Sequence, residues 1–389
     1  MFTLLFGGLF YYTIPLLIGE ITLLNVVYNQ KINNLIYLIY CFSFLVSFYF
    51  MHKNDSNKKK VVQYKLRGNL NKQNSKALNF IVFIIGVIFI IGVYRFGLSN
   101  YLIITKGDNE ENMILIQAGV MLSMIILPVT VYYRKIYTFS VCFLILLSFL
   151  LYGARSYFVV AIISSVFIFF KFREIQLIKK IHWFVLGTGF VFGMAIFKNV
   201  FSIIKSASFN DVITVIKNLN YDLVISQVII DPMAVIYNLN YTINNKIDLS
   251  IDHLFHRGLS IIPGGGNLFS LLTGKEYPRY ASVLANHYTD IHWGLASSLY
   301  AELIAISGYF GFILIYILMN KIVVKFNNNI KLKDLNIFNL VFISSFTYLL
   351  FYSHRLDITF VLGIFKYSIL IWLFLKFISF NVSKKVSIR

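Results

Sequence analysis

Charged side chains are scarce in this chain. Of its 389 residues only 13% are Asp, Glu, Lys or Arg, whereas an average soluble protein carries about 25%. A globule of this size with so little charge cannot cover its surface with ionised groups. The composition therefore excludes a soluble enzyme, a secreted disulfide scaffold and a DNA-binding domain.

Cysteine is also nearly missing. The two residues of this type, Cys41 and Cys142, each lie inside an apolar block. A disulfide framework needs several cysteines at regular spacing, and a zinc site needs them grouped with each other or with histidines. The sequence offers neither arrangement.

Apolar residues make up 58% of the chain, with 39 Phe and 26 Tyr. They fall in blocks of about 17–25 residues, the length that crosses a hydrocarbon core of about 30 Å. Unpaired backbone groups are too costly in lipid for an open sheet, so spans are expected to be helices. We predict an all-α polytopic membrane protein with about ten spans, at 4–28, 35–51, 77–97, 113–133, 137–153, 156–171, 182–198, 296–320, 336–353 and 358–377.

The loops between these spans alternate in charge. Most of the Lys and Arg residues occur in loops 52–76, 134–135, 171–180 and 321–334 and in the tail after 376, all on one predicted side. Basic loops stay in the cytoplasm, so both termini are predicted to be cytoplasmic. The net charge of +19 is then explained by topology and anionic-lipid contact, and no nucleic-acid partner is expected.

Three segments follow from this layout. Residues 1–198 hold seven predicted transmembrane helices with basic cytoplasmic loops, residues 199–295 form a large extracytoplasmic loop, and residues 296–389 hold three further helices and the basic tail. In the loop, apolar patches alternate with polar residues, as in helices that lie along a membrane surface. About 97 structureless residues would be implausible in a compact protein. We expect a partly helical cap.

Charged residues at or near hydrocarbon depth on the outer side are functional candidates, because burying one costs at least about 2.5–3.5 kcal/mol. They are Glu20, Arg155, Glu302 and Arg355. Each has a structural alternative. Arg155 could be an arginine whose side chain reaches to the membrane interface. Arg355 could form a local ion pair with Asp357. Glu20 and Glu302 could be buried acids with a structural role.

The outer loop adds Arg257, in Phe-His-Arg-Gly, and Arg279, in Tyr-Pro-Arg-Tyr. A guanidinium is always charged and its rigid fork fits phosphate oxygens. An enzyme acting on a polyprenyl-diphosphate lipid would need two or three such forks. Gly264-Gly265-Gly266 lacks a following Lys-Ser/Thr and indicates a turn, not a nucleotide-binding loop.

Histidines gather in the outer segment, but no compact carboxylate set or His-Glu-x-x-His helix accompanies them, so no metal site is expected. His292 is better placed as a proton shuttle or a donor to sugar hydroxyls. The aromatic residues around it are candidates for stacking on sugar rings, although most Phe and Tyr in such a chain face lipid.

Two short motifs stand out in this layout: Gly153-Ala154-Arg155-Ser156 opens a span, and Ala301-Glu302 is followed by Gly308-Tyr309-Phe310-Gly311. Together with the layout, they resemble the bacterial O-antigen and capsular-polysaccharide polymerases of the Wzy type. The family pattern has an alanine-glutamate pair and then a glycine-x-x-glycine. The layout covers nearly the whole chain and the motifs about a tenth of it. Leu303–Ser307 departs from the aromatic run common in the family.

The resemblance implies a GT-C-like glycosyltransferase in the bacterial inner membrane. Such an enzyme polymerises oligosaccharide repeat units carried on undecaprenyl diphosphate at the outer face, without cofactor, metal or nucleotide sugar. A flippase and a chain-length regulator are its expected partners. In this mechanism Arg155, Arg257 and Arg279 would bind the departing diphosphate, and Glu302, or else His292, would be the general base.

Two other functions remain open. A flippase or transporter of lipid-linked sugars would share the membrane layout, but transporters usually carry internal repeats with interrupted helices, and no such symmetry is visible in the sequence. A ligase that transfers glycan to a lipid or protein acceptor would differ from a polymerase only in its acceptor pocket.

Overall fold

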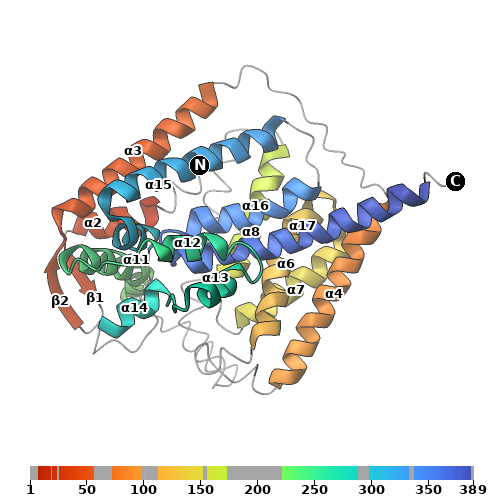
Figure 1. The fold of residues 1–389 in the computed structure, drawn as a ribbon, viewed down its shortest axis with the longest axis horizontal. Helices are drawn as coiled ribbons and strands as arrows, with labels where there is room; N and C mark the ends of the chain where they lie inside the picture. The colour runs from red at the N-terminus through yellow and green to blue at the C-terminus, as the bar shows by residue number, and fades with distance from the viewer. Residues whose placement is uncertain are drawn as a thin grey trace. The chain divides into compact units, whose positions relative to one another are not determined.

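The structure is a computed structural model of the full chain, shown in Figure 1. It describes residues 8–18, 20–23, 26–56, 72–97, 101, 113–151, 156–172, 221–287, 298–332 and 337–386. Within these ranges the chain is helical apart from one short two-stranded hairpin. The prediction of a mainly helical protein is confirmed to that extent.

The chain divides into two compact units that are both discontinuous in sequence. The first combines Met1–Val62, Ser226–Asp334 and Phe346–Lys366; the second combines Gln63–Ile225, Leu335–Ser345 and Tyr367–Arg389. The three consecutive segments predicted from the loop pattern describe membrane topology and stay a prediction. Residues 226–287 of the predicted outer loop fall in the first unit, whereas residues 221–225 fall in the second.

The first unit contains most of the short elements. Its elements are η1 (Leu9–Thr13), α2 (Ile14–Ile18), β1 (Glu20–Leu23), β2 (Val26–Lys31), α3 (Asn34–Ser56), α11 (Tyr221–Asn244), α12 (Asp252–Leu259), α13 (Gly265–Thr273), α14 (Tyr280–His287) and α15 (Leu299–Leu332). Helix α11 belongs to this unit from Ser226 onward. It also holds the end of α16 (Ile337–Tyr352) and the beginning of α17 (Ile358–Val386).

The second unit is built around α6. Its helices are α4 (Lys72–Phe96), α6 (Ile114–Tyr132), α7 (Ile136–Leu151) and α8 (Ser156–Phe172), with the remaining parts of α16 and α17. Gly119 on α6 lies so close to Phe89 on α4 that an added Cβ would be 3.1 Å from the Phe89 Cβ. Small residues at such crossings let apolar helices approach closely.

Eight of the ten predicted spans coincide with a helix in the described residues. Among the described residues, three helical stretches are long and apolar enough to cross a membrane: Ser75–Phe96, Ile114–Tyr132 and Leu299–Phe326. Shorter apolar helices occur at Asn34–Phe50, Ile136–Leu150, Ser156–Val166 and Asn339–Tyr352. These helices support membrane association, whereas the count of ten spans stays a prediction. The predicted span 182–198 lies outside the described residues.

The expected first span, 4–28, is not one continuous helix. Ile14–Ile18 forms only a short helix, and Glu20–Leu23 pairs antiparallel with Val26–Lys31. Val26, Val27 and Tyr28 are β-branched or aromatic, and such residues favour strands. The apolar composition predicted a helical span here and did not distinguish a helix from a hairpin. Glu20 therefore begins a strand and is not inside a helix.

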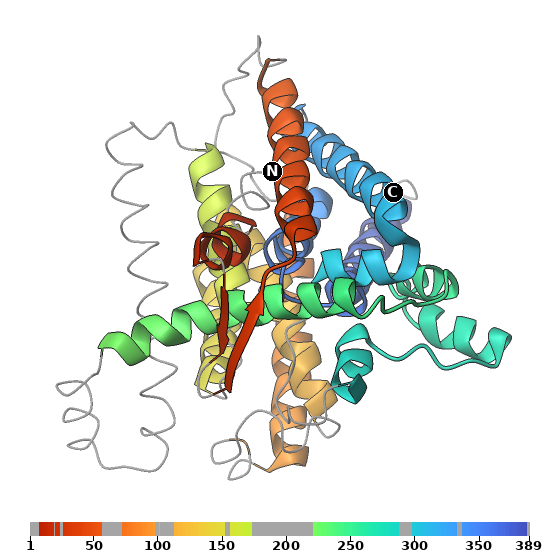
Figure 2. The ribbon, with the colours of Figure 1, turned by 90° about the vertical axis from the view of Figure 1, so that its left-hand side faces the viewer.

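The end of the hairpin is fastened to α11, which passes the two strands in Figure 2. The Asn33 amide nitrogen donates to Asn240 Oδ1 at 3.0 Å, and Asn33 Nδ2 donates to Asn244 Oδ1 at 2.8 Å. Farther along, the Tyr280 hydroxyl at the start of α14 hydrogen-bonds the Thr242 hydroxyl. These bonds give the polar face of α11 its partners and fix the hairpin and α14 on the same helix.

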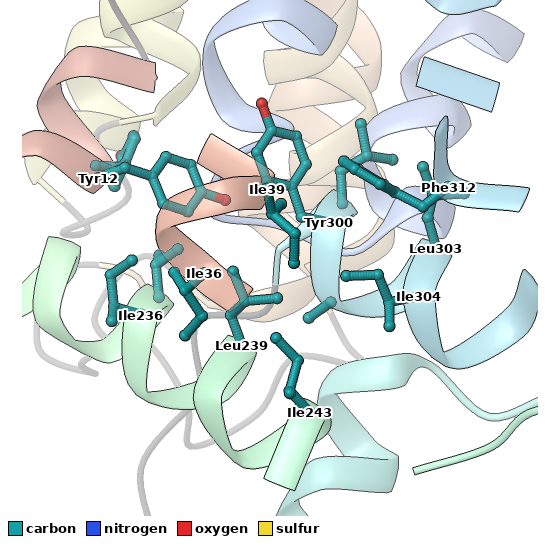
Figure 3. Packing of buried hydrophobic residues seen from close by; sticks show 14 of the residues in the cluster. Tyr12, Ile36, Ile39, Ile236, Leu239, Ile243, Tyr300, Leu303, Ile304 and Phe312 are labelled. Atoms are coloured by element: carbon teal, nitrogen blue, oxygen red, sulfur yellow. The ribbon is translucent and has the colours of Figure 1, made fainter. Parts of the chain in front are cut away.

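The apolar core of the first unit lies where α3, α11 and α15 meet. Figure 3 shows Ile36 and Ile39 of α3, Ile236 and Leu239 of α11, and Leu303 of α15 converging. Burying such a side chain contributes about 1.5–3 kcal/mol. The core therefore holds together elements that are more than 200 residues apart in the sequence.

Helix α15 is sharply broken at Gly308, which has φ +63° and ψ −173°. The Tyr300 and Tyr316 hydroxyls, on opposite sides of the break, lie 3.2 Å apart, although 16 residues of straight helix would separate their Cα atoms by about 24 Å. The same bend brings Gly311 against Ser307, where an added Cβ would be 2.3 Å from the Ser307 Cβ. Both glycines of the Gly-x-x-Gly pattern are thus needed by the bend.

Candidate functional site

The candidate site is centred on Glu302, a fully buried carboxylate in the first turn of α15. The preceding Ser298 side chain caps this helix by accepting from the Ala301 amide at 3.1 Å. Glu302 Oε2 itself accepts a hydrogen bond from the backbone amide of Ile358, at the start of α17, at 2.5 Å. Helix N-termini favour negative charge, so two of them stabilise this carboxylate.

Arg257 of α12 supplies the countercharge and is also fully buried. Its Nε donates to Glu302 Oε1 at 3.0 Å, and its Nη1 and Nη2 donate to the carbonyls of Tyr277 at 3.2 Å and Pro278 at 2.6 Å. All three nitrogens of the fork have protein partners. Breaking a buried pair by removing one member costs about 3–5 kcal/mol, so this pair fastens α12 to α15.

His256 lies beside the pair. Arg257 Nη1 is 3.1 Å from His256 Nδ1, and because a guanidinium can only donate, this nitrogen accepts. The ring stacks on Tyr277 at a centroid distance of 5.0 Å. Burial, followed by the Arg257 charge, lowers the pKa of His256 below its ordinary range. The imidazole is therefore neutral near pH 7, as its role of acceptor requires.

A second acid belongs to the same neighbourhood. Asp357 is 5% exposed and interacts electrostatically with Glu302. It directly precedes Ile358, whose amide binds Glu302, in the turn that joins α16 and α17. The same turn meets α15 through the Leu299 amide, which donates to the Ser353 carbonyl at 2.8 Å. The site thus lies at the shared end of three helices.

An aromatic cluster surrounds the first residues of α15. Tyr12 stacks on Tyr300 with ring centroids 5.1 Å apart, and the buried His354 ring meets both edge-on at 5.6 and 5.5 Å. No sequence pattern connects His354 with Tyr12, because 342 residues separate them. Neither residue carries a motif that could have revealed the contact.

A chain of buried hydroxyl groups runs from this cluster along α15. The Tyr316 hydroxyl lies 3.2 Å from that of Tyr300 and 2.8 Å from that of Ser47 on α3. Ser47 also lies 3.3 Å from Asn320 Oδ1. Buried polar groups must find partners, and these four satisfy one another. No sequence pattern predicted these contacts, because the residues are separated by up to 273 positions.

The five predicted site residues meet different outcomes. Glu302 and Arg257 are in direct contact. Arg279 is exposed, but it directly follows Pro278, whose carbonyl binds Arg257. Arg155 and His292 lie outside the described residues. The structure therefore brings Glu302 and Arg257 together, and Arg279 is the neighbour in sequence of a residue that binds Arg257.

A metal-binding cluster or a match to a known protein would help to identify this site. In the part of the chain that the structure describes, no group of three or more His, Cys, Asp or Glu side chains is arranged to hold a metal ion. No family model, curated protein or solved structure matches the sequence. The contacts around Glu302 are thus the basis for a functional proposal.

Proposed function

We propose that this chain is a membrane glycosyltransferase, similar to the Wzy-type polymerases, that joins undecaprenyl-diphosphate-linked oligosaccharide units at the outer face of a bacterial cytoplasmic membrane. The observation that carries the proposal is the buried Glu302–Arg257 pair, at the beginning of a helix apolar enough to span a membrane. Placing an ionisable side chain in a membrane-spanning helix costs free energy, so such residues are candidates for a functional site by default.

In the proposed reaction the Glu302 carboxylate takes a proton from a hydroxyl of the acceptor sugar. That oxygen forms a bond to the anomeric carbon of the donor, and the bond from this carbon to the diphosphate oxygen breaks. The diphosphate leaves with the electron pair, and cationic side chains stabilise its charge. Arg155, Arg257 and Arg279 are the proposed cations, and His292 is the second candidate for the base.

The pairing seen in the structure suggests how the base is kept inactive without substrate. Glu302 is held by Arg257 and by the Ile358 amide, so its oxygens are occupied. An arriving diphosphate competes with Glu302 for the Arg257 fork, which binds phosphate and carboxylate with the same geometry. Substrate binding would then release the carboxylate for proton transfer at the moment it is needed.

Additional positive charge near the pair supports this reading. Arg279 follows the Pro278 carbonyl that anchors Arg257, and it interacts electrostatically with Lys366 on α17. Two cations that repel each other gain from an anion placed near both. A diphosphate would supply that anion.

The test is to replace Glu302 by Gln, which keeps its size and removes its ability to accept the proton. Loss of a general base typically lowers the rate about 10²–10⁴-fold, so long-chain glycan should disappear from cells lacking the native gene. Glu276→Gln, at an exposed position, is the matched control and should leave the polymer unchanged. Normal glycan with Glu302→Gln, at equal protein levels in the membrane, would remove this residue from the chemistry.

One observation favours the flippase alternative. Helix α15 is interrupted at Gly308, and broken helices beside buried charges are typical of transporters. Proteoliposomes holding labelled lipid-linked oligosaccharide separate the two functions. Polymer formation without movement of lipid across the bilayer supports the glycosyltransferase, and movement without polymer supports the flippase.

A further inference from the structure

The helical hairpin α12–α13, defined here as residues 251–273, exposes an unusual amount of apolar surface. Its two helices have eight and nine residues, far fewer than the roughly 20 needed to cross a bilayer. Six large apolar side chains of the hairpin are more than half exposed: Ile251 51%, Phe255 60%, Ile262 55%, Leu268 58%, Leu271 80% and Leu272 77%. Surfaces of this kind mark contacts with other molecules or with lipid.

On α13 the exposed leucines share one face. Leu268, Leu271 and Leu272 follow an i, i+3, i+4 spacing, which places them side by side on a helix. Another face packs against α12 and the segment that follows the hairpin: an added Cβ on Gly266 would meet His256 at 3.2 Å, and the ring centroids of Phe269 and Tyr277 are 5.4 Å apart. The leucines therefore point away from the protein.

The same division holds on α12. Phe255 is two residues before Arg257, a rotation of about 200° on a helix, so it points away from the side that binds Glu302. Ile251 is four residues before Phe255 and shares its face. Leu254, on the inner side, packs against the core of the unit. Each helix of the hairpin thus has one anchored side and one exposed apolar side.

The anchor shows where the hairpin is held. Arg257 binds Glu302, and Glu302 binds the amide of Ile358, the first residue of α17. The turn before Ile358 joins α16 and α17, which match two predicted spans. Were α16 and α17 to cross the membrane as the sequence predicts, the turn that joins them would lie near one membrane surface. The hairpin anchored to this turn would then lie near the same surface.

We propose that α12–α13 is an interfacial membrane element whose exposed apolar side chains insert among the lipids at one membrane surface. The charges near it are of both signs, Lys246 and Lys275 with Asp248 and Glu276, so burial of apolar area and not attraction to anionic headgroups drives the insertion. The partner is the phospholipid bilayer itself, and zwitterionic lipid is sufficient. This inference holds whether or not the chain is a glycosyltransferase.

Nitroxide labels measure the proposed depth. Single cysteines replace Leu271 or Phe255 in a Cys41→Ser, Cys142→Ala background, and the full chain is reconstituted in phosphatidylcholine vesicles. Lys275→Cys, whose native side chain is 65% exposed, is the matched control. The ratio of collision rates with oxygen, which concentrates in lipid, to those with a water-soluble nickel chelate should be severalfold higher at 271 and 255 than at 275.

Two results would overturn the proposal. Equal ratios at all three positions mean that the hairpin lies in water. Low collision rates with both reagents at 271 and 255 mean that protein, such as a second copy, covers the face. The native chain gives an independent reading: a photoactivatable phosphatidylcholine with its reactive group near the top of the acyl chain should modify residues 251–272, and protection of this stretch would contradict insertion.

Discussion

Two ion pairs involve α12, and they differ mainly in burial. Arg257 and Glu302 are 0% exposed with a nitrogen–oxygen distance of 3.0 Å, whereas Lys275 and Asp252 are 65% and 36% exposed at 3.4 Å. Water screens the second pair, and such pairs contribute about 0–1 kcal/mol. The first pair cannot be hydrated once broken. The position of α12 therefore depends on its inward arginine and hardly on its outward aspartate.

Removing one member of the buried pair should have the largest effect on stability. Arg257→Leu leaves the Glu302 charge buried without its countercharge and should cost about 3–5 kcal/mol. The double change Arg257→Leu, Glu302→Leu should cost clearly less, because two apolar side chains can replace a buried pair. Thermal unfolding in detergent measures both. A double variant as unstable as Arg257→Leu would show that the unpaired charge of Glu302 does not cause the loss of stability.

Straightening α15 should have the next largest effect, because it separates Tyr300 from Tyr316, which meet across the break at Gly308. Any side chain at position 308 meets a conformation open almost only to glycine, at a cost of about 1–3 kcal/mol. Gly311→Ala forces its Cβ into Ser307 and should also destabilise. Gly363→Ala lies inside α17 with nothing within 4 Å and is the control: alanine is the better helix former, so the unfolding midpoint should stay the same or rise. Equal midpoints for all three variants would contradict the rigid bend.

The stability of the folded protein should also depend on pH, because α12 carries two half-buried histidines. The pKa values of His253 and His256 are lowered in the folded protein, chiefly by burial and next by Arg257. The unfolded chain therefore binds more protons as pH falls through the ordinary histidine range, and stability decreases there. Below the lowered pKa values the loss levels off. His256→Gln should reduce this dependence in unfolding measured between about pH 7 and 5, and an unchanged profile would argue against it.

The exposed pair should give the smallest effect. Asp252→Asn removes the interaction with Lys275, and unfolding should change by at most about 0.5 kcal/mol. High salt should abolish even this difference, because exposed charges are screened. A loss as large as that of Arg257→Leu would mean that exposure does not separate the two pairs.

Local sequence features predicted much of the fold. Apolar blocks of the right length marked eight segments that are helical. The cost of burying charge singled out Glu302, and the fit of a guanidinium to phosphate singled out Arg257. The Gly-x-x-Gly pattern was noticed through a family resemblance, whereas the structure explains it by the bend at Gly308 and the contact between Gly311 and Ser307. Composition did not predict the hairpin at 20–31, because apolar residues indicate burial in strands and helices alike.

The sequence by itself determined that this protein is helical and rich in segments suited to a membrane, since hydropathy and length are properties of consecutive residues. Only the tertiary structure decided that Arg257 meets Glu302. Their contact spans 45 residues and depends on the carbonyls of Tyr277 and Pro278, which hold the arginine, and on the Ile358 amide, which binds the carboxylate. Which charges become partners depends on the path of the whole chain, and no local pattern encodes that path.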